Sequence, residues 1–242
     1  MYKGTGRIEA QREVVGHYGY AASFGRLVDF VNSLLPSNEH IGRALRTTRP
    51  MYPEIAVREL VANALIHQDF FMTGTGPMFE IFTDRVEITN PGTPLIDPAR
   101  FIDATPISRN EALAALMRRM NICEERGSGI DKVIFAAEVF QLPAPDFRVS
   151  ESHTKAVLFA PRPLTAMSRD DRIRACYQHA VLQYVSGKSM TNASLRERFQ
   201  IPEQNYATAS RIIADAIEAQ WIKPFEPSNK SRRHARYVPI WA

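Results

Sequence analysis

Three polar side chains in the first third of the chain recur at helical spacing. Glu59, Asn63 and His67 are each four residues apart, so a helix over 53–68 would place them on one face, with Asp69 just beyond its end. A carboxylate there could orient or deprotonate a water, and an amide oxygen could coordinate a hard cation such as Mg²⁺. The alternative is an ordinary amphipathic helix with a solvated polar face. Against that alternative, Asn63 has an alanine on either side in a largely apolar helix.

A second candidate group is Gly127-Ser128-Gly129, which precedes a predicted helix over 130–140. Two glycines let backbone N–H groups approach an anion, and the positive end of a helix dipole attracts phosphate. A simple turn between two helices would use the same residues, so both interpretations stay open. A nucleophile elbow is excluded, because the positions on either side are not glycines.

Other nucleotide and metal motifs do not fit the sequence. The tripeptide 187–189 (GKS) resembles the end of a P-loop, but Leu182 occupies the position of the first P-loop glycine. These residues therefore provide no P-loop ATPase or helicase motor. The two cysteines, Cys123 and Cys176, lie in different regions, which excludes a disulfide scaffold and a Cys-rich zinc site.

Composition places the chain among ordinary globular proteins. It has 242 residues, of which 45% are hydrophobic and 23% are charged, so general disorder is not expected. No apolar run reaches the roughly 18 residues that a membrane span needs. Together with the low cysteine content, this predicts a cytoplasmic protein.

The positive charge is concentrated at the C-terminal end. Residues 222–242 hold five basic side chains and one acidic side chain, Glu226, so this segment has a charge of +4. The net charge of the whole chain is also +4. A basic patch of this kind is the electrostatic signature of a nucleic-acid-binding surface. A solvated, flexible tail is the alternative that charge alone leaves open.

Periodicity predicts two domains joined by a linker at 161–169. The first domain, 1–160, should contain helices and strands over 21–35, 53–68, 78–82, 85–89, 110–120, 130–140, 147–150 and 154–159, with a turn at 90–92. The second, 170–242, should contain helices over 170–185, 192–199 and 204–219, and two strands at 221–222 and 237–241 around a basic loop, 227–236.

Three helices and a basic hairpin are the outline of a winged helix. The helix 204–219 would then read base edges in duplex DNA, and the basic loop would contact phosphates. The predicted DNA-binding residues are Gln204, Asn205, Thr208, Arg211, Lys230, Arg232, Arg233 and Arg236. Packing of this helix against a partner subunit is the alternative, and a homodimer is compatible with it.

Four ordered segments resemble a known family. They are Tyr52-Pro53 followed by 58–70 (RELVANALIHQDF), 84–92 (DRVEITNPG), 108–110 (SRN) and 124–130 (EERGSGI). Together they resemble the RecG-like transcriptional regulators, whose C-terminal half is a degenerate histidine-kinase-like ATPase domain of the GHKL type. The resemblance covers roughly residues 1–160. Relatives of this kind usually carry an N-terminal Schlafen/AlbA-type domain, so the sequence looks like a C-terminal portion or a shortened relative.

The resemblance implies an α+β fold, a Bergerat-type two-layer α/β sandwich, that binds ATP and Mg²⁺. Glu59 would be the water-activating base and Asn63 the Mg²⁺ ligand, and residues 93–126 would form the ATP lid. The sequence departs from the usual Asp-x-Gly-x-Gly at 90–94, where Asn90 lacks the charged acceptor of an aspartate. The implied nucleotide-binding residues are Asn63, His67, Asp69, Asn90, Gly92, Gly127, Ser128 and Gly129.

Two functions of different classes follow. The first is a transcriptional regulator, in which a winged helix binds double-stranded DNA and a degenerate nucleotide-binding domain governs it. The second is a GHKL-type, Mg²⁺-dependent ATPase whose C-terminal domain mediates protein contacts. A pseudo-ATPase scaffold that binds neither ligand tightly is a third interpretation.

Overall fold

The computed structural model of the chain describes residues 1–16, 19–41, 46–123, 127–226 and 235–242, with the backbone alone within 38–49. The described chain divides into two units. The first unit comprises residues 1–140 and 145–160, and the second comprises residues 141–144 and 161–242.

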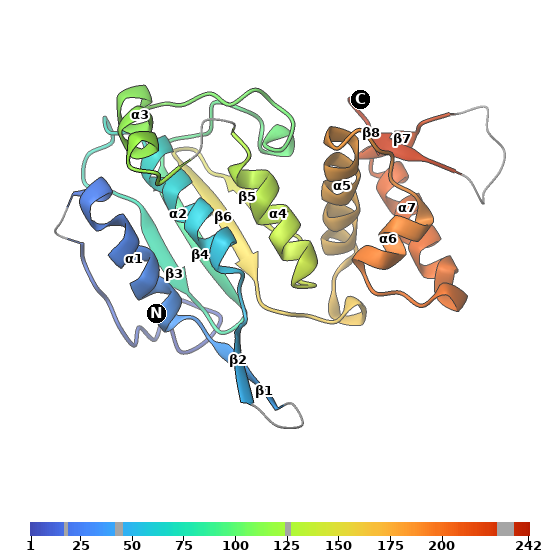
Figure 1. Ribbon diagram of the computed structural model, residues 1–242, viewed down its shortest axis with the longest axis horizontal. Coiled ribbons are helices and arrows are strands. Elements are labelled where there is room, and N and C mark those ends of the chain that lie inside the picture. The colour runs from blue at the N-terminus through green and yellow to red at the C-terminus, as the bar shows by residue number, and fades with distance from the viewer. Residues whose placement is uncertain (17–18, 42–45, 124–126, 227–234) are drawn as a thin grey trace. The chain divides into compact units, whose positions relative to one another are not determined.

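Helices and strands alternate irregularly along the first unit (Figure 1). In chain order they are α1 (Tyr20–Leu34), β1 (Ser37–Ile41), β2 (Arg46–Pro50), α2 (Glu54–His67), β3 (Met78–Ile81), β4 (Arg85–Pro91), the 3₁₀ turn η1 (Pro98–Arg100), α3 (Glu111–Arg119), α4 (Gly129–Val139), β5 (Asp146–Val149) and β6 (His153–Phe159). The predicted α+β class is therefore confirmed.

The main sheet of the first unit has four antiparallel strands in the order β3-β4-β6-β5. Helices α1, α2 and α4 lie over one face of this sheet, with α2 in contact with α1, α4 and β4 (Figure 1). A helix enclosed on several sides must be apolar around most of its circumference. Accordingly α2 is buried from Ala56 to Ile66 except at two positions, Arg58 and Asn63.

Strand β4 extends beyond the turn that the sequence predicts at 90–92. It runs to Pro91, which pairs with His153 of β6. A proline is tolerated in a sheet where no neighbouring strand needs its missing N–H. The first pairing of β3 is Met78 with Thr89, so β3 offers no partner to Pro91 on that side.

Two short strands of the first unit precede α2. Strands β1 and β2 pair antiparallel, from Ser37 opposite Pro50 to Ile41 opposite Arg46. The polar sequence of this segment has no alternation that would reveal the pairing.

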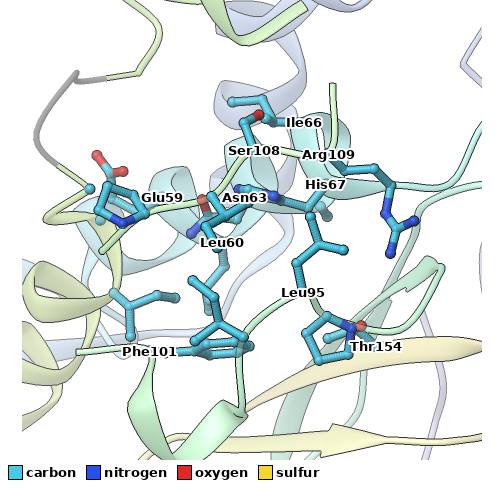
Figure 2. A pocket seen from close by; sticks show the side chains of 18 of the residues that line it. Glu59, Leu60, Asn63, Ile66, His67, Leu95, Phe101, Ser108, Arg109 and Thr154 are labelled. Atoms are coloured by element: carbon cyan, nitrogen blue, oxygen red, sulfur yellow. The ribbon is translucent and has the colours of Figure 1, made fainter. Parts of the chain in front are cut away.

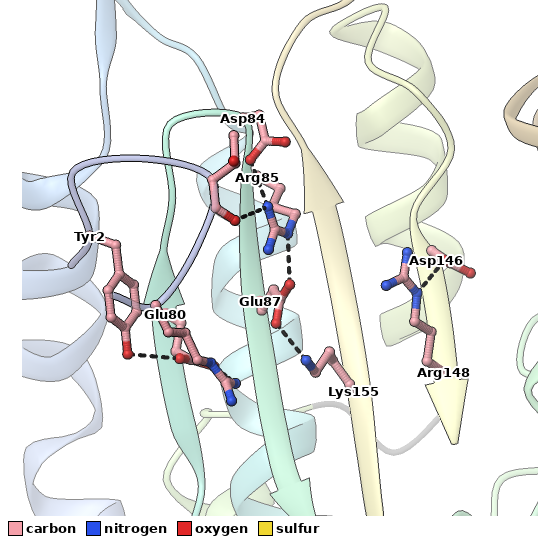
Figure 3. Close-up of polar contacts among 10 residues, drawn as sticks. Tyr2, Glu80, Asp84, Arg85, Glu87, Asp146, Arg148 and Lys155 are labelled. Atoms are coloured by element: carbon pink, nitrogen blue, oxygen red, sulfur yellow. Dashed lines mark hydrogen bonds and ion pairs between the residues drawn. The ribbon is translucent and has the colours of Figure 1, made fainter. Parts of the chain in front are cut away.

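The face of the main sheet that is turned away from α2 carries buried charges. Glu80 and Glu87 are directly opposite each other on β3 and β4, and they are 3% and 4% exposed. Tyr2 donates its hydroxyl to Glu80 Oε1 at 3.0 Å (Figure 3). Arg7 forms an ion pair with the same carboxylate. The N-terminal residues therefore cover this face and neutralise one of the two opposed carboxylates, because a buried charge needs a partner.

The second carboxylate is neutralised from within the sheet. Arg85 Nε donates to Glu87 Oε1 at 2.7 Å, and Lys155 Nζ donates to Oε2 at 2.5 Å. Burial raises the pKa of Glu87, but the hydrogen bonds from Lys155 and Arg85 lower it more, so that its pKa lies below the usual range.

Glu87→Gln should make the first unit less stable and less sensitive to acid. A lowered pKa means that the carboxylate contributes stability above the unfolded-state pKa of about 4.3, and that this contribution is lost as the pH falls through the lower folded value. We expect the free energy of unfolding at pH 7 to fall by about 1–3 kcal/mol. We also expect a smaller loss of stability between pH 5 and pH 3, measured by urea denaturation. The exposed Glu151→Gln is the control, and an unchanged pH dependence in Glu87→Gln would contradict the prediction.

The described part of the second unit contains three α-helices and a small antiparallel sheet (Figure 1). Its elements are η2 (Leu164–Ala166), α5 (Arg169–Val185), α6 (Asn192–Arg198), η3 (Glu203–Asn205), α7 (Tyr206–Glu218), β7 (Ile222–Pro224) and β8 (Tyr237–Pro239). A single bridge between Met190 and Tyr237 connects the segment before α6 to β8. Fully buried side chains of all three helices and of β7 form its core, among them Cys176, Leu195, Ile212 and Ile222.

The helix predicted at 204–219 begins later than expected. Pro202 is extended, with φ −56° and ψ 152°, and the N–H of Asn205 donates to its carbonyl at 2.9 Å. This tight turn forms η3, and α7 starts after it at Tyr206.

No helix in the described part of the chain is both long enough and apolar enough to span a bilayer.

Candidate functional site

A cavity of about 280 Å³ lies in the first unit between α2, the central strands and the segment that follows β4. Glu59, Asn63 and His67 line it from α2, one helical turn after another (Figure 2). Phe101 and Thr154 lie across the cavity from them. The polar side chains of an otherwise buried helix thus face an opening.

One end of the cavity brings Glu59, Asn63 and Gly129 together. A Cβ atom added to Gly129 would lie 2.9 Å from Glu59 Oε2 and 3.6 Å from Asn63 Nδ2. Glu59 is 4% exposed, and Arg58 Nη1 donates to its Oε1 at 3.1 Å. Arg58 Nη2 also donates to the carbonyl of Asn121 at 3.0 Å, which connects α2 to the segment before α4. A carboxylate, an amide and exposed backbone therefore converge at this end.

The turn at 127–129 requires glycine for two reasons. Gly127 has a positive φ of 67°, and a Cβ atom there would lie 2.6 Å from Cγ of Pro106. Pro106 also lines the cavity, so this turn packs against the segment 93–109. Ser128 is the N-cap of α4, and Glu124, Glu125 and Arg126 of the predicted motif lie outside the described residues.

Gly127→Ala should destabilise the first unit. A left-handed backbone costs an alanine about 1–2 kcal/mol, and the contact with Pro106 adds to that cost. We expect the free energy of unfolding to fall by about 1–3 kcal/mol in urea denaturation. Gly25→Ala is the matched control, because Gly25 lies in α1 with open space around it and should gain about 0.5–1 kcal/mol. Equal stability changes in the two variants would contradict the prediction.

The other end of the cavity is built around Asn90. This residue is 8% exposed on β4, directly opposite Thr154 of β6, and its Nδ2 donates to the carbonyl of Pro91 at 3.3 Å. The hydroxyl of Thr154 donates to the carbonyl of Gly92 at 2.7 Å. The sequence analysis did not identify Thr154, because only strand pairing brings it beside Asn90.

Asp69 and Gly92 were predicted to bind nucleotide, but they do not line the cavity. The N–H of Asp69 donates to the carbonyl of Pro91 at 2.8 Å, and its carboxylate pairs with Arg109 at 3.5 Å. Gly92 has a φ of 100°, and a Cβ there would lie 3.0 Å from Asp69 Cβ. Both residues thus hold the loop after β4 in place next to the cavity.

His67 lines the cavity beside Arg109, one helical turn beyond Asn63 (Figure 2). Burial lowers its pKa, and the positive charge of Arg109 lowers it further. The imidazole is therefore neutral at pH 7 and can donate one hydrogen bond and accept another.

The structure adds cavity residues that the sequence analysis did not select: Ser108, Arg109, Arg118 and Thr154. Ser108 and Arg109 belong to the segment 108–110, one of the four that resemble the RecG-like family, so the sequence did contain a signal for these two cavity residues. The hydroxyl of Ser108 is buried and has no hydrogen-bond partner among the described residues. Arg118 lies in the last turn of α3 beside Arg119, and nothing in the sequence distinguishes the two arginines.

In the second unit, the predicted base-reading residues share an exposed surface. Gln204 and Asn205 lie in η3, Thr208 and Arg211 lie in the first half of α7, and all four side chains are exposed. Arg236 is also exposed and forms an ion pair with Glu226. The other predicted phosphate contacts, Lys230, Arg232 and Arg233, lie outside the described residues.

Comparison with known proteins supports an ATPase-like domain in the first unit. The family described as "Putative ATP-dependent DNA helicase recG C-terminal" matches residues 74–158. This match supports a RecG-like domain of the GHKL type, and it includes β3 to β6 and the turn at 127–129. The matched residues begin after α2, so Glu59, Asn63 and His67 lie outside them.

A solved structure shares the fold. The DIP2311 protein from Corynebacterium diphtheriae aligns with a TM-score of 0.55 and 18% sequence identity, over 90% of this chain and 45% of that one. This chain therefore spans less than half the length of that protein. No curated protein matches the sequence.

Proposed function

We propose that the protein is a DNA-binding transcriptional regulator whose first unit binds Mg-ATP and whose second unit binds duplex DNA. The observation that carries the nucleotide part of the proposal is the convergence of Glu59, Asn63 and Gly129 at one end of a cavity. The match of residues 74–158 to an ATPase-type family supports the nucleotide part.

The chemistry of the cavity suits a nucleotide. Apolar side chains such as Leu60, Ile88 and Ala156 line it alongside a small number of polar groups, as in most small-molecule sites. Asn90 and Thr154 would hold the base by hydrogen bonds, and the backbone at Gly127 and Gly129 would approach the phosphates.

Magnesium would enter this site together with the phosphates. The described residues contain no group of three or more His, Cys, Asp or Glu side chains that could hold a metal ion. Mg²⁺ usually keeps several waters and binds through one or two protein groups plus substrate phosphates, and Asn63 would be such a group. When bound, the ion would neutralise phosphate charge, and Glu59 would accept a proton from a water beside it.

The arrangement of the second unit supports duplex DNA as its ligand. Asn192 Nδ2 at the start of α6 donates to the carbonyl of Tyr206 at 3.1 Å and to Ser210 Oγ at 3.0 Å, which ties α6 to α7. Two helices joined in this way, followed by β7 and β8, support a winged helix with an exposed N-terminal half of α7.

Thermal unfolding with each ligand separately tests both parts. A ligand that binds only the folded state raises the unfolding free energy by RT ln(1 + [L]/Kd), which is about 2.7 kcal/mol at 100 Kd. We expect an upward shift with Mg-ATP that EDTA reduces and Asn63→Ala abolishes, and a separate shift with duplex DNA at low salt. The absence of either shift at millimolar ATP or micromolar DNA would contradict the corresponding part.

The alternative is an ATPase whose second unit mediates protein contacts. The presence of both Glu59 and Asn63 in the cavity favours it, because binding alone needs no general base. ATP turnover without any salt-dependent DNA binding would support this alternative over the regulator.

A further inference from the structure

Two arginines line the cavity, and they differ in what they contact. Arg109 is occupied: its Nη2 donates to the carbonyl of Thr93 at 2.6 Å, and its Nη1 pairs with Asp69. Arg118 forms no hydrogen bond or ion pair with its side chain anywhere in the described parts of the chain. Its five donors are available to a ligand in the cavity.

The two arginines also mark opposite ends of the cavity. The guanidinium carbon of Arg109 lies 3.6 Å from the Cβ position of Gly92, beside the loop after β4. Burial raises the pKa of the Cys123 thiol, Arg118 opposes this rise and Glu59 adds to it. Hydrogen bonds place Arg118 at the end that holds Glu59: Arg58, the partner of Glu59, donates to the carbonyl of Asn121 at 3.0 Å, and the N–H of Asn121 donates to the carbonyl of Arg118 at 2.9 Å.

The charges at this end favour a cation beside a bound anion. The carboxylate of Glu59 would repel a phosphate, and Arg58 pairs with that carboxylate. Arg118 adds a positive charge to the lining of the cavity. A guanidinium also presents parallel N–H groups that match two phosphate oxygens.

We propose that Arg118 binds the terminal phosphates of the nucleotide and makes the site prefer nucleoside di- and triphosphates over monophosphates. This inference rests on the proposed nucleotide-binding function. On this proposal the phosphates bind at the end of the cavity that holds Glu59. No residue of α3 was predicted from the sequence to bind a ligand.

The test compares Arg118→Gln, Arg118→Lys and the matched control Arg119→Gln. Arg119 is the next residue of the same helix, is exposed and does not line the cavity. Isothermal titration calorimetry with ATP, ADP, AMP and inorganic triphosphate, each with Mg²⁺, gives the affinities. Far-ultraviolet circular dichroism and the unfolding midpoint show whether each variant is folded.

We expect Arg118→Gln to weaken ATP and inorganic triphosphate roughly 10- to 100-fold, as for the loss of a charge-assisted hydrogen bond, and AMP less than threefold. Arg118→Lys should keep part of the affinity, and Arg119→Gln should bind like the wild type. Equal weakening of ATP and AMP, or no weakening, in a wild type that binds ATP would overturn the assignment of Arg118 alone.

The triphosphate separates the two proposals. A wild type that binds triphosphate through Arg118 but no nucleotide would support the phosphate contact and contradict the nucleotide function. A wild type that binds neither ligand would overturn both.

Discussion

Glu59→Gln should reduce ATP hydrolysis at least about 100-fold while Mg-ATP still binds within a few-fold of the wild-type affinity. The amide keeps the size of the carboxylate and can still accept the hydrogen bond from Arg58, so the packing around α2 is retained. It cannot accept a proton from the attacking water. A general base contributes about 10²–10⁴-fold to such a rate, which sets the expected loss.

Phosphate release under single-turnover conditions measures the rate, and calorimetry measures the affinity for Mg-ATP. Glu54→Gln is the control, because Glu54 is exposed in the first turn of the same helix and does not line this cavity. Equal rates in Glu59→Gln and the wild type would show that Glu59 is not the base. A wild type that binds Mg-ATP without turnover would make the first unit a nucleotide sensor and not an ATPase.

Neutralising two arginines of the basic loop should weaken binding to every duplex by roughly tenfold or more near 0.15 M salt. Arg232→Gln combined with Arg233→Gln removes two proposed phosphate contacts, which carry no sequence information. The slope of log K against log salt should fall by about 0.9 per lost contact. Fluorescence anisotropy with a labelled duplex library at several salt concentrations gives both quantities.

The control for this experiment has the same net charge. Lys3 and Arg119 are exposed in the first unit, and their double replacement by glutamine should leave DNA affinity nearly unchanged. Equal losses in the two double variants would mean that net charge, and not the loop, drives association. Complete absence of salt-dependent binding by the wild type would show that the second unit does not bind DNA.

Arg211→Ala should act differently, because its side chain is exposed in the half of α7 that would enter the major groove. A specific base contact is worth about 1–3 kcal/mol of discrimination. We therefore expect a changed sequence preference at one position of the site, with a salt slope close to that of the wild type.

Local chemistry made much of the secondary structure predictable from the sequence. The helix predicted over 53–68 is α2, because its apolar spacing and the proline before it act over a few residues. The helix predicted over 170–185 is α5, and its start is also fixed locally, because Ser168 and Asp171, three residues apart, form a capping box. Local rules did not predict what strand pairing decided: β1 and β2 pair with each other, and β4 continues to Pro91.

For the site, the sequence by itself determined that Glu59, Asn63 and His67 share a helix face and that a glycine turn precedes α4. Only the tertiary structure placed that turn against Glu59, because the approach depends on how α4 packs beside α2. It also pairs Asp69 with Arg109, and among the described residues it leaves the side chain of Arg118 in the cavity without a hydrogen bond or ion pair. The positions and partners of these residues depend on contacts between segments far apart in the chain, which short-range spacing does not encode.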